Sequence, residues 1–374
     1  MNRVGDIVIR ILHVIGSLNN GGSQAMVMNL YRNIDRKKVQ FDFIIDREDE
    51  VFFADEIKEL GGRIFTVPTF KGWNILSYLK SWNDFFKNHT DYKIIHGHVR
   101  STASLYLNIA NRYGLTSISH SHNTSSGRGV FAVVKNIMQY PIRFSADYFF
   151  ACSKEAGEWL FGRKISEKKN YFVLKNAIDS KKFIIDSEIR EEIRKKHNVS
   201  DKFVIGHVGR FHPQKNHQFL LDVFFEVRKK DSSAVLMLVG DGTLKHDIEE
   251  KAIKLGILNS IIFIGVSSEV PKIMQAMDAF VFPSLYEGLG IVVIEAQASG
   301  LFCVVADTIP DETNITNEVK YLALNRSSAY WADEIILTRK THKRTDNISR
   351  IIKSGYDIEQ TSSWLQNFYI NKWE

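Results

Sequence analysis

The stretch DAFVFPSLYEGLGIVVIEAQASG, residues 278–300, carries the clearest signals of the fold. Its apolar run 279–282 predicts a short buried strand that ends at Pro283, and residues 291–298 predict a helix. The loop between them holds Glu287 next to glycines. A strand, a glycine loop and a helix in this order leave unpaired N–H groups and a partial positive charge at the loop, so the stretch predicts an anion-binding turn.

Glu295 is the only acidic residue in that predicted helix. A carboxylate on an otherwise apolar helix is costly if it is buried without a partner. Charged side chains usually lie outside, so a solvated or capping role is the alternative for both Glu287 and Glu295. The position just after a glycine loop instead favours contact with a hydroxyl-rich ligand.

Strand and helix patterns alternate along the chain, which predicts an α/β protein with parallel sheets covered by helices. With 374 residues the chain is too long for one ordinary core, so two domains are expected. A charged helix is predicted at 187–197, and the change of domain is expected within 176–202. The predicted strands are 7–15, 41–45, 63–67, 93–95, 117–119, 148–152, 171–174, 203–208, 235–239, 261–264, 279–282 and 302–306.

The net charge of +6 is unevenly distributed. Residues 1–180 hold 24 Lys and Arg against 17 Asp and Glu, a balance of +7, and the remainder holds 25 against 26, a balance of −1. Such asymmetry suggests that one domain meets an anionic surface, with membrane phospholipid or nucleic acid as candidates. A solvated basic face without a partner is the alternative.

Two predicted helical segments, 71–93 and 128–144, interleave basic residues with aromatic or aliphatic ones. This composition suits a membrane interface, although the apolar side chains could equally face the core. No transmembrane run and no signal peptide are expected. Cys152 and Cys303 are too few for a disulfide framework, and a reducing cytoplasm is therefore expected.

Polar and glycine residues follow the predicted strands of the first half. Gly21 and Gly22 allow close approach of a ligand to the backbone, and Ser23 is expected to cap the next helix. Two histidine pairs, 96/98 and 120/122, follow strands, and ligands of open parallel sheets bind beyond the carboxyl ends of strands. No carboxylate or cysteine lies at ligand spacing, so no metal site is expected. The acidic run 46–50 is interpreted as a solvated loop.

The second half opens with a basic loop after a strand. The fork of Arg210 matches phosphate oxygens in pairs, and Lys215 adds a mobile charge, so together they could hold a diphosphate without a metal. Gly240 and Gly242 end the next strand in a tight turn. Because both loops lie at one sheet edge, we expect them to converge.

In this order, Arg210-x4-Lys215, Gly240-Asp241-Gly242 and Glu287-x7-Glu295 resemble the donor-site motifs of family 4 of the retaining glycosyltransferases, which have the GT-B fold. The glycine pair at 21–22 and the stretch 176–179 also match family positions. The resemblance spans nearly the whole chain and is of the bacterial capsule and exopolysaccharide type.

The resemblance implies two Rossmann-like domains with parallel sheets facing across a cleft. Residues 1–180 would form an acceptor-binding domain together with a C-terminal helix at about 360–374 that crosses back to it. Residues 181–359 would bind the nucleotide-sugar.

The resemblance also implies roles for single residues. Arg210 and Lys215 would neutralise the leaving diphosphate, and Glu295 would bind the ribose hydroxyls. His122 would lie over the transferred sugar, with His120 as the less favoured register. Glu287, with the N–H groups of Gly288, Leu289 and Gly290, would hold the sugar and phosphate. The remaining donor-binding positions would be Gly21, Gly22, Gly240 and Gly242.

The implied reaction is transfer of a hexose or N-acetylhexosamine, with retention of configuration, from a nucleotide-sugar to a lipid-linked or other glycan acceptor. A UDP-sugar is the favoured donor, and the products would be capsule, exopolysaccharide or lipopolysaccharide precursors. No cofactor and no obligatory metal are implied. The enzyme would be cytoplasmic and peripheral at the anionic inner face of the cell membrane, with no nucleic-acid partner.

Two other function classes are alternatives. A nucleotide-sugar epimerase of related fold is disfavoured by the Glu287-x7-Glu295 spacing. A basic nucleic-acid-binding protein fits the sequence pI near 9.0, but no recognised nucleic-acid motif is present.

Three positions depart from the family pattern. Gly290 and Phe302 stand where proline is usual, and Ala177 replaces the usual glycine of Asn-Gly-Ile-Asp. Gly290 is expected to change the stiffness of the loop near the sugar. Ala177 requires a backbone that is not left-handed.

Overall fold

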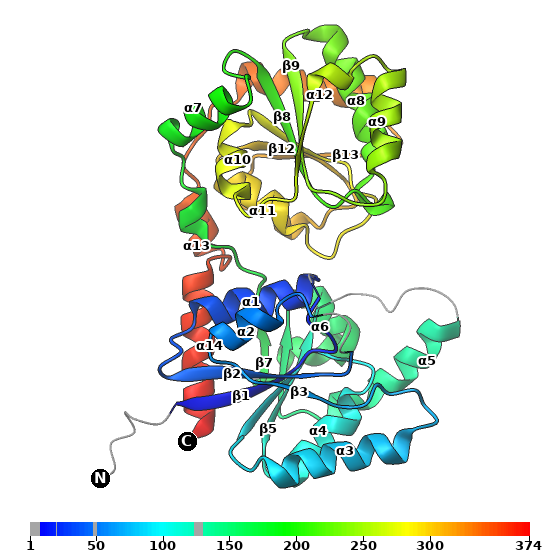
Figure 1. Cartoon of the computed structure of the whole chain (residues 1–374), viewed down its shortest axis with the longest axis vertical. Coiled ribbons are helices and arrows are strands. Elements are labelled where there is room, and N and C mark those ends of the chain that lie inside the picture. Colours follow the sequence, from blue (N-terminus) through cyan, green and yellow to red (C-terminus); the bar gives the residue numbers. More distant parts are fainter. Residues whose placement is uncertain (1–7, 20, 48–50, 123–129) are drawn as a thin grey trace. The chain divides into compact units, whose positions relative to one another are not determined.

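The computed structural model describes residues 8–19, 21–47, 51–122 and 130–374, with side chains from 135 onward in the last range. The chain divides into two compact units (Figure 1). Unit 1 comprises Met1–Ala177 and Ile358–Glu374, and unit 2 comprises Ile178–Asp357. The sequence placed these boundaries at 180/181 and 359/360. Each unit is described by itself.

Unit 1 is built on a seven-stranded parallel sheet in the order β3-β2-β1-β4-β5-β6-β7. The strand order reverses between β1 and β4, and such a switch point is where open α/β sheets bind ligands. The strands are β1 Ile9–Val14, β2 Val39–Ile45, β3 Ile64–Thr66, β4 Ile94–Gly97, β5 Thr116–Ser121, β6 Tyr148–Ala151 and β7 Tyr171–Val173. The helices are α1 Gly22–Asn33, α2 Ala54–Glu59, α3 Ile75–Asn88, α4 Ala103–Arg112, α5 Val130–Gln139, η1 Tyr140–Phe144, α6 Lys154–Phe161, η2 Arg163–Glu167 and α14 Ile358–Trp373.

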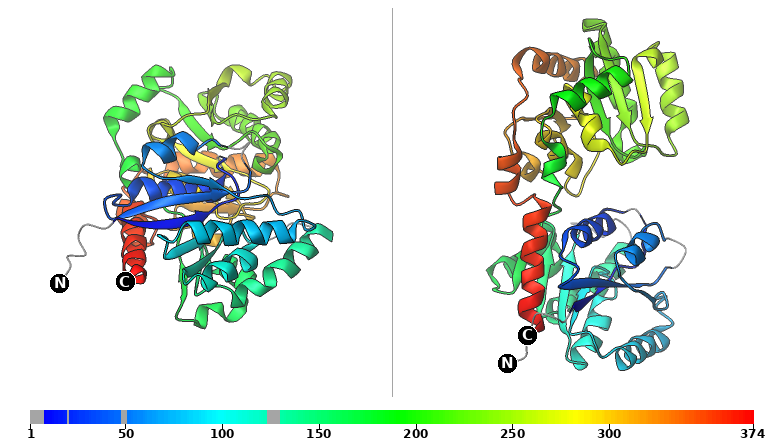
Figure 2. Two further views of the ribbon diagram at one scale, coloured as in Figure 1. Left: turned by 60° about the horizontal axis from the view of Figure 1, so that its bottom comes forward. Right: turned by 60° about the vertical axis from the view of Figure 1, so that its left-hand side comes forward.

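The strands of unit 1 have buried side chains on both faces because helices cover both sides of the sheet. Successive β1 residues show this: Ile11 belongs to one core cluster and Leu12 to the other. The C-terminal helix α14 packs on the Ile11 side, where Tyr369 meets Phe41 edge to face with ring centroids 6.0 Å apart. Figure 2 shows this helix, in red, beside β1 and β2. It starts at Ile358, earlier than the predicted crossing helix at about 360–374, and it belongs to unit 1 as predicted.

Unit 2 is built on a six-stranded parallel sheet in the order β10-β9-β8-β11-β12-β13. Its order reverses between β8 and β11. The strands are β8 Phe203–Val208, β9 Ala234–Val239, β10 Ile261–Gly265, β11 Ala279–Phe282, β12 Phe302–Ala306 and β13 Val319–Leu322. The helices are η3 Ser180–Phe183, α7 Ser187–Lys196, η4 Pro213–Lys215, α8 His217–Lys230, α9 Lys245–Lys254, η5 Leu258–Ser260, α10 Val270–Ala276, α11 Ile291–Ala298, η6 Asp311–Thr313, α12 Ser328–Thr341 and α13 Ile348–Lys353.

Two strand predictions needed correction. His96 and His120 lie inside β4 and β5, because the ladder pairing continues through His96 with Ile118 and through His120 with Phe150. Only His98 and His122 follow their strands. The edge strand β13 was missed, since its four residues VKYL include a lysine and form no continuous apolar run.

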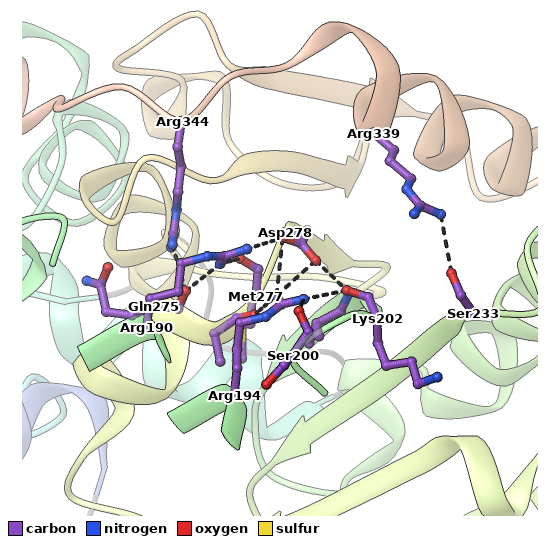
Figure 3. A network of polar contacts seen from close by, with 12 residues as sticks. Arg190, Arg194, Ser200, Lys202, Ser233, Gln275, Met277, Asp278, Arg339 and Arg344 are labelled. Atoms are coloured by element: carbon purple, nitrogen blue, oxygen red, sulfur yellow. Dashed lines mark hydrogen bonds and ion pairs between the residues drawn. The ribbon is translucent and has the colours of Figure 1, made fainter. Parts of the chain in front are cut away.

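A polar network closes the amino-terminal edge of the unit 2 sheet (Figure 3). The Asp278 carboxylate, which precedes β11, accepts from the N–H of Val204 at 2.7 Å and pairs with Arg190 at 2.5 Å. Arg190, Arg194 and Arg344 also donate to the carbonyl groups of residues 274–277 at the end of α10. Helix C-termini carry partial negative charge, so these cations stabilise the helix end. The carboxyl ends of the strands, which carry the candidate site, lie at the other edge.

Candidate functional site

Gly240 and Gly242 bring the loop after β9 against the loop after β8. The backbone of Gly240 has φ of +135°, and a Cβ there would lie 2.2 Å from the carbonyl oxygen of Gly209. A Cβ on Gly242 would lie 2.5 Å from the carbonyl oxygen of Phe211. The N–H of Phe211 donates to the carbonyl of Asp241 at 2.8 Å. Only glycine fits at both positions, and the tight turn predicted here is confirmed.

The Lys215 ammonium and the Glu287 carboxylate form an ion pair with an N–O distance of 2.6 Å. Their side chains are 18% and 9% exposed, and the Lys215 nitrogen also lies 4.7 Å from the centre of the Phe282 ring. The two loops that carry them are joined by hydrogen bonds of 2.8 Å from the Leu285 N–H to the carbonyl of Gln214 and from the Gln214 amide to the carbonyl of Tyr286. The structure thus brings together two residues that lie 72 positions apart.

Arg210 lies in the same β8 loop, and its side chain is exposed. Within the described part of the chain, its guanidinium makes no hydrogen bond or ion pair. The neighbouring residues Gly209 and Phe211 are fixed by backbone bonds to Val239 and Asp241. The loop therefore presents an exposed guanidinium, unpaired among the described residues, on a backbone that is fixed by hydrogen bonds.

Helix α11 begins at Ile291 after Gly290, whose backbone is left-handed with φ of +81° and ψ of 49°. Proline is fixed near φ of −65°, so the family's usual proline could not adopt this conformation. A Cβ on Gly288 would meet no atom within 4 Å, which leaves the loop open at that point. The first N–H groups of α11 have no partner within the helix and can bind an anion.

Glu295 is partly buried, and its carboxylate has no protein partner among the described residues, unlike that of Glu287. It lies one turn after Ile291 on the same helix face, and these two are the residues of α11 that are not fully buried. Burial raises the pKa of the Glu295 carboxyl group to about 7. Acids with such perturbed pKa values concentrate at functional sites.

The amino-terminal glycine pair of unit 1 starts helix α1. Gly21 is the N-cap residue and α1 begins at Gly22. Ser23 therefore lies inside the first turn, where its hydroxyl donates to the Gln24 side chain at 2.9 Å, so the expected Ser23 cap is wrong. A Cβ on Gly22 would meet nothing within 4 Å, and the backbone is accessible there.

A cavity of about 380 Å³ opens in unit 1 at the carboxyl ends of β1, β2 and β4. Three cations and one acid line it, so its electrostatic balance favours an anion. Asp46 is partly buried, so the interpretation of 46–50 as a solvated loop is wrong at this residue. Residues 48–50 of that run lie outside the described residues. Burial raises the pKa of Asp46 and lowers the pKa of Arg100. The lining residues are Ile15, Gly16, Ser23, Gln24, Asp46, Arg47, Thr69, Phe70, His98, Val99, Arg100, Ser101, His122, Lys135 and Gln139.

His122 lies on the wall of this cavity, and its Nε2 is 2.8 Å from Nδ1 of His98. His120 is 1% exposed and is not part of the wall; its Nδ1 lies 3.2 Å from Nε2 of His96. Burial lowers the pKa of His122 to about 3, so its imidazole is neutral.

Sequence reasoning missed several residues of this edge. It did not single out His13, Arg47 or Arg100. Arg47 and Arg100 lie in the loops just after β2 and β4, a signal that could have found them. His13 lies within β1, and nothing local distinguishes it from a buried core residue.

The first amphipathic segment divides between the core and the surface. Trp82, Phe85 and Phe86 of α3 are buried, so these aromatic residues belong to the core and not to a membrane interface. At the start of the segment, however, Trp73 and Leu76 are each 81% exposed.

In the second segment, 128–144, residues 128 and 129 and the side chains of 130–134 lie outside the described residues. Further along, Ile137 is 69%, Tyr140 55% and Phe144 78% exposed. The Arg143 guanidinium lies 4.8 Å from the centre of the Tyr140 ring. None of the helices in the described ranges has the length and apolar composition needed to cross a bilayer.

Comparison with known proteins agrees with this architecture. Residues 20–182 match the description Glycosyltransferase Family 4, and residues 189–354 match Glycosyl transferases group 1. The crystal structure of Anabaena Alr3699/HepE in complex with UDP superposes with a TM-score of 0.78 at 16% identity, covering 98% of this chain and 100% of that one. At this identity the likeness shows the fold, which is GT-B.

Sequence relatives cover nearly the whole chain. EpsF of Bacillus subtilis (strain 168), named as a glycosyltransferase, is 34% identical over 368 residues, 96% of each chain. UDP-Gal:alpha-D-GlcNAc-diphosphoundecaprenol alpha-1,3-galactosyltransferase of Escherichia coli is 25% identical over 329 residues, 83% of this chain and 84% of that one. Capsular polysaccharide biosynthesis glycosyltransferase CapH of Staphylococcus aureus is 23% identical over 383 residues, 98% of this chain and 99% of that one. The chain therefore belongs to family 4 of the glycosyltransferases, among those of the bacterial capsule and exopolysaccharide type.

Proposed function

We propose that this glycosyltransferase moves a hexose or N-acetylhexosamine from a UDP-sugar to a lipid-linked glycan precursor, with retention of configuration and without an obligatory metal. The observation that carries the proposal is the Lys215–Glu287 ion pair, with an N–O distance of 2.6 Å, at the carboxyl edge of unit 2 beside the Arg210 loop and the start of α11. The UDP bound to the Anabaena structure and the name of the Escherichia coli relative support the choice of donor and acceptor.

Cations at the diphosphate would supply most of the rate enhancement. Breaking the anomeric bond leaves a diphosphate anion and an oxocarbenium-like sugar, and fixed positive groups stabilise that charge separation. Arg210 and Lys215 would contact the phosphates, and the N–H groups of Gly288, Leu289 and Gly290 would add oriented dipoles. In this scheme a UDP-sugar displaces Lys215 from Glu287, whose carboxylate then accepts from sugar hydroxyls.

Glu295 would accept hydrogen bonds from the two ribose hydroxyls. Its carboxyl group has a pKa of about 7 because it is buried without a partner. Hydroxyl donors stabilise the ionised form, so donor binding is expected to lower this pKa and release a proton near neutral pH. Gly240 and Gly242 would contribute by keeping the two phosphate-facing loops together.

The unit 1 cavity would bind the acceptor. Arg47, Arg100 and Lys135 give it a positive balance against Asp46, as the diphosphate of a lipid-linked acceptor requires. His122 on its wall would contact the transferred sugar, and the backbone at Gly21 and Gly22 would contact the nucleotide-sugar donor. The exposed Trp73, Leu76, Ile137 and Phe144 would contact the anionic inner face of the cell membrane.

The test is a transfer assay with UDP-, GDP- and ADP-sugars, a diphosphate-linked lipid acceptor and a chelator. Product formation from one UDP-sugar, with the anomeric configuration of the donor retained by NMR, would support the proposal. Absence of both transfer and slow donor hydrolysis with every donor would refute it. Conversion of a donor without any acceptor would instead support the epimerase alternative.

A further inference from the structure

Five histidines from three neighbouring strands of unit 1 lie against one another in the core. His13, His96 and His120 are each 1% exposed and His98 is 9% exposed. Their rings contact each other with centroid distances from 4.1 to 5.3 Å. We call this set the histidine cluster; it consists of His13, His96, His98, His120 and His122.

The ten ring nitrogens of the cluster are unevenly satisfied. Six of them form three imidazole–imidazole contacts: 3.0 Å between His13 Nδ1 and His98 Nε2, 2.8 Å between His98 Nδ1 and His122 Nε2, and 3.2 Å between His96 Nε2 and His120 Nδ1. A seventh, His96 Nδ1, lies 2.6 Å from the Tyr369 hydroxyl. Among the residues that the structure describes, the other three are buried without a hydrogen-bond partner: His13 Nε2, His120 Nε2 and His122 Nδ1.

Neutral imidazoles carry one N–H and one lone pair each, so a chain of them cannot satisfy both of its ends. In the row His13–His98–His122, one terminal nitrogen is left with an unused proton and the other with an unused lone pair. Buried polar groups are normally paired, and each exception calls for an explanation. A metal ion that accepts lone pairs from several rings at once would engage one of them, the unpartnered Nε2 of His120.

We propose that His98, His120 and His122 bind a divalent transition metal ion, with Zn²⁺ preferred. One ring nitrogen from each lies within 4.8 Å of the others. Because His120 Nδ1 contacts His96, its unpartnered Nε2 is the nitrogen that would face the ion, together with His98 Nδ1 and His122 Nε2. Nitrogens bound to Zn²⁺ at about 2.0–2.1 Å lie about 3.3 Å apart in a tetrahedral site, so small side-chain shifts suffice.

The groups behind these ligands fit a metal site. The outer nitrogen of His98 faces His13, and the outer nitrogen of His120 faces His96, which in turn contacts Tyr369. Ligating histidines usually donate their second N–H in this way, which fixes the ring orientation. Neutral imidazole suits Zn²⁺, Cu²⁺ or Ni²⁺ and not Mg²⁺ or Ca²⁺, which prefer oxygen ligands.

The alternative triad, His13 with His96 and His98, is less suitable. His98 and His122 line the unit 1 cavity, whereas His13 and His96 do not, so an ion can reach the first triad from the cavity. The cavity also leaves room for water as a fourth ligand.

The proposal is tested by metal binding to the whole protein after chelator treatment, without any sugar donor. Titration with Co²⁺ is expected to give one ion per chain and the intense visible absorption of a four-coordinate nitrogen site, which Zn²⁺ then removes. His120→Gln is expected to weaken binding by at least about tenfold. His217→Gln, which removes a buried histidine of unit 2, is the matched control and is expected to bind normally.

The proposal would be overturned if the native protein bound neither Co²⁺ nor Zn²⁺. It would also be overturned if His120→Gln bound these ions as tightly as the native protein and gave the same spectrum. Circular dichroism shows whether each variant is folded, and His122→Gln replaces His120→Gln if the latter is not. Because donor and acceptor are absent, failure here is distinct from failure of the proposed transfer reaction.

Discussion

The two sheets carry opposite kinds of polar chemistry at their carboxyl edges. In unit 1, five imidazoles are packed together, and burial holds the pKa values of all five below the usual range, so they are neutral. In unit 2, the same edge holds the exposed Arg210 and the Lys215–Glu287 ion pair. The difference shows that one architecture can carry desolvated neutral rings at the edge of one sheet and paired or exposed ions at the edge of the other.

The largest expected effect comes from removing the Arg210 guanidinium, which is exposed and unpaired among the described residues. Arg210→Ala is expected to lower kcat/KM for transfer by about a hundredfold or more, equivalent to about 3 kcal/mol of lost transition-state stabilisation. The thermal unfolding temperature is expected to stay unchanged because the side chain makes no bond within the described residues. Arg326→Ala, another exposed arginine of unit 2, is the control. Equal activity of the two variants would remove Arg210 from the donor site.

The second test separates the structural and catalytic contributions of the ion pair. Glu287→Gln leaves the Lys215 ammonium mostly buried beside an uncharged amide, which is expected to lower the free energy of unfolding by about 2 kcal/mol. In the double variant Lys215→Met with Glu287→Gln, most of this stability is expected to return while transfer remains lost. Denaturant unfolding and initial rates measure the two effects. Recovery of activity in the double variant would show that the pair has only a structural role.

A third test uses pH to probe Glu295. Its pKa is raised from an ordinary 4.5 to about 7 in the folded chain, so its contribution to stability is complete below about pH 4.5 and is lost as pH rises through 7. Glu295→Gln, which cannot ionise, is expected to be more stable than the native protein at pH 8 by about 1–2 kcal/mol and no more stable at pH 5. Glu188→Gln, an exposed acid of α7, is expected to show no such pH dependence. A constant difference across this range would mean that Glu295 is ionised at all these pH values.

The smallest effect concerns the surface of unit 1. Replacing both Trp73 and Leu76, each 81% exposed, by serine is expected to reduce binding to anionic liposomes about fivefold with little change in stability. Leu337→Ser in unit 2, where the leucine is 51% exposed, is the control. Sedimentation at low salt measures the bound fraction. Unchanged sedimentation of the double variant would argue against this surface as the membrane contact.

Elements with strong local signals could be predicted from the sequence. Strands β8 and β11 and helix α11 have the predicted bounds, because apolar runs and the glycine and proline that end them are local features. The partner of Lys215 could be suggested only by the family resemblance. The aromatic residues of α3 show the opposite case: basic and aromatic spacing suits both a membrane and a core, and only the packing of Trp82 decided between them.

The sequence by itself determined the fold class, the family and the loops that follow the strands of unit 2, because each rests on short local patterns whose order along the chain can be read directly. The tertiary structure alone decided that His13, His96, His98, His120 and His122 meet, and that His122 faces the cavity while His120 does not. The physical reason is strand order. The sheet places β1 beside β4 and β4 beside β5, and that pairing depends on contacts between residues up to 83 positions apart, which no local pattern of the chain encodes.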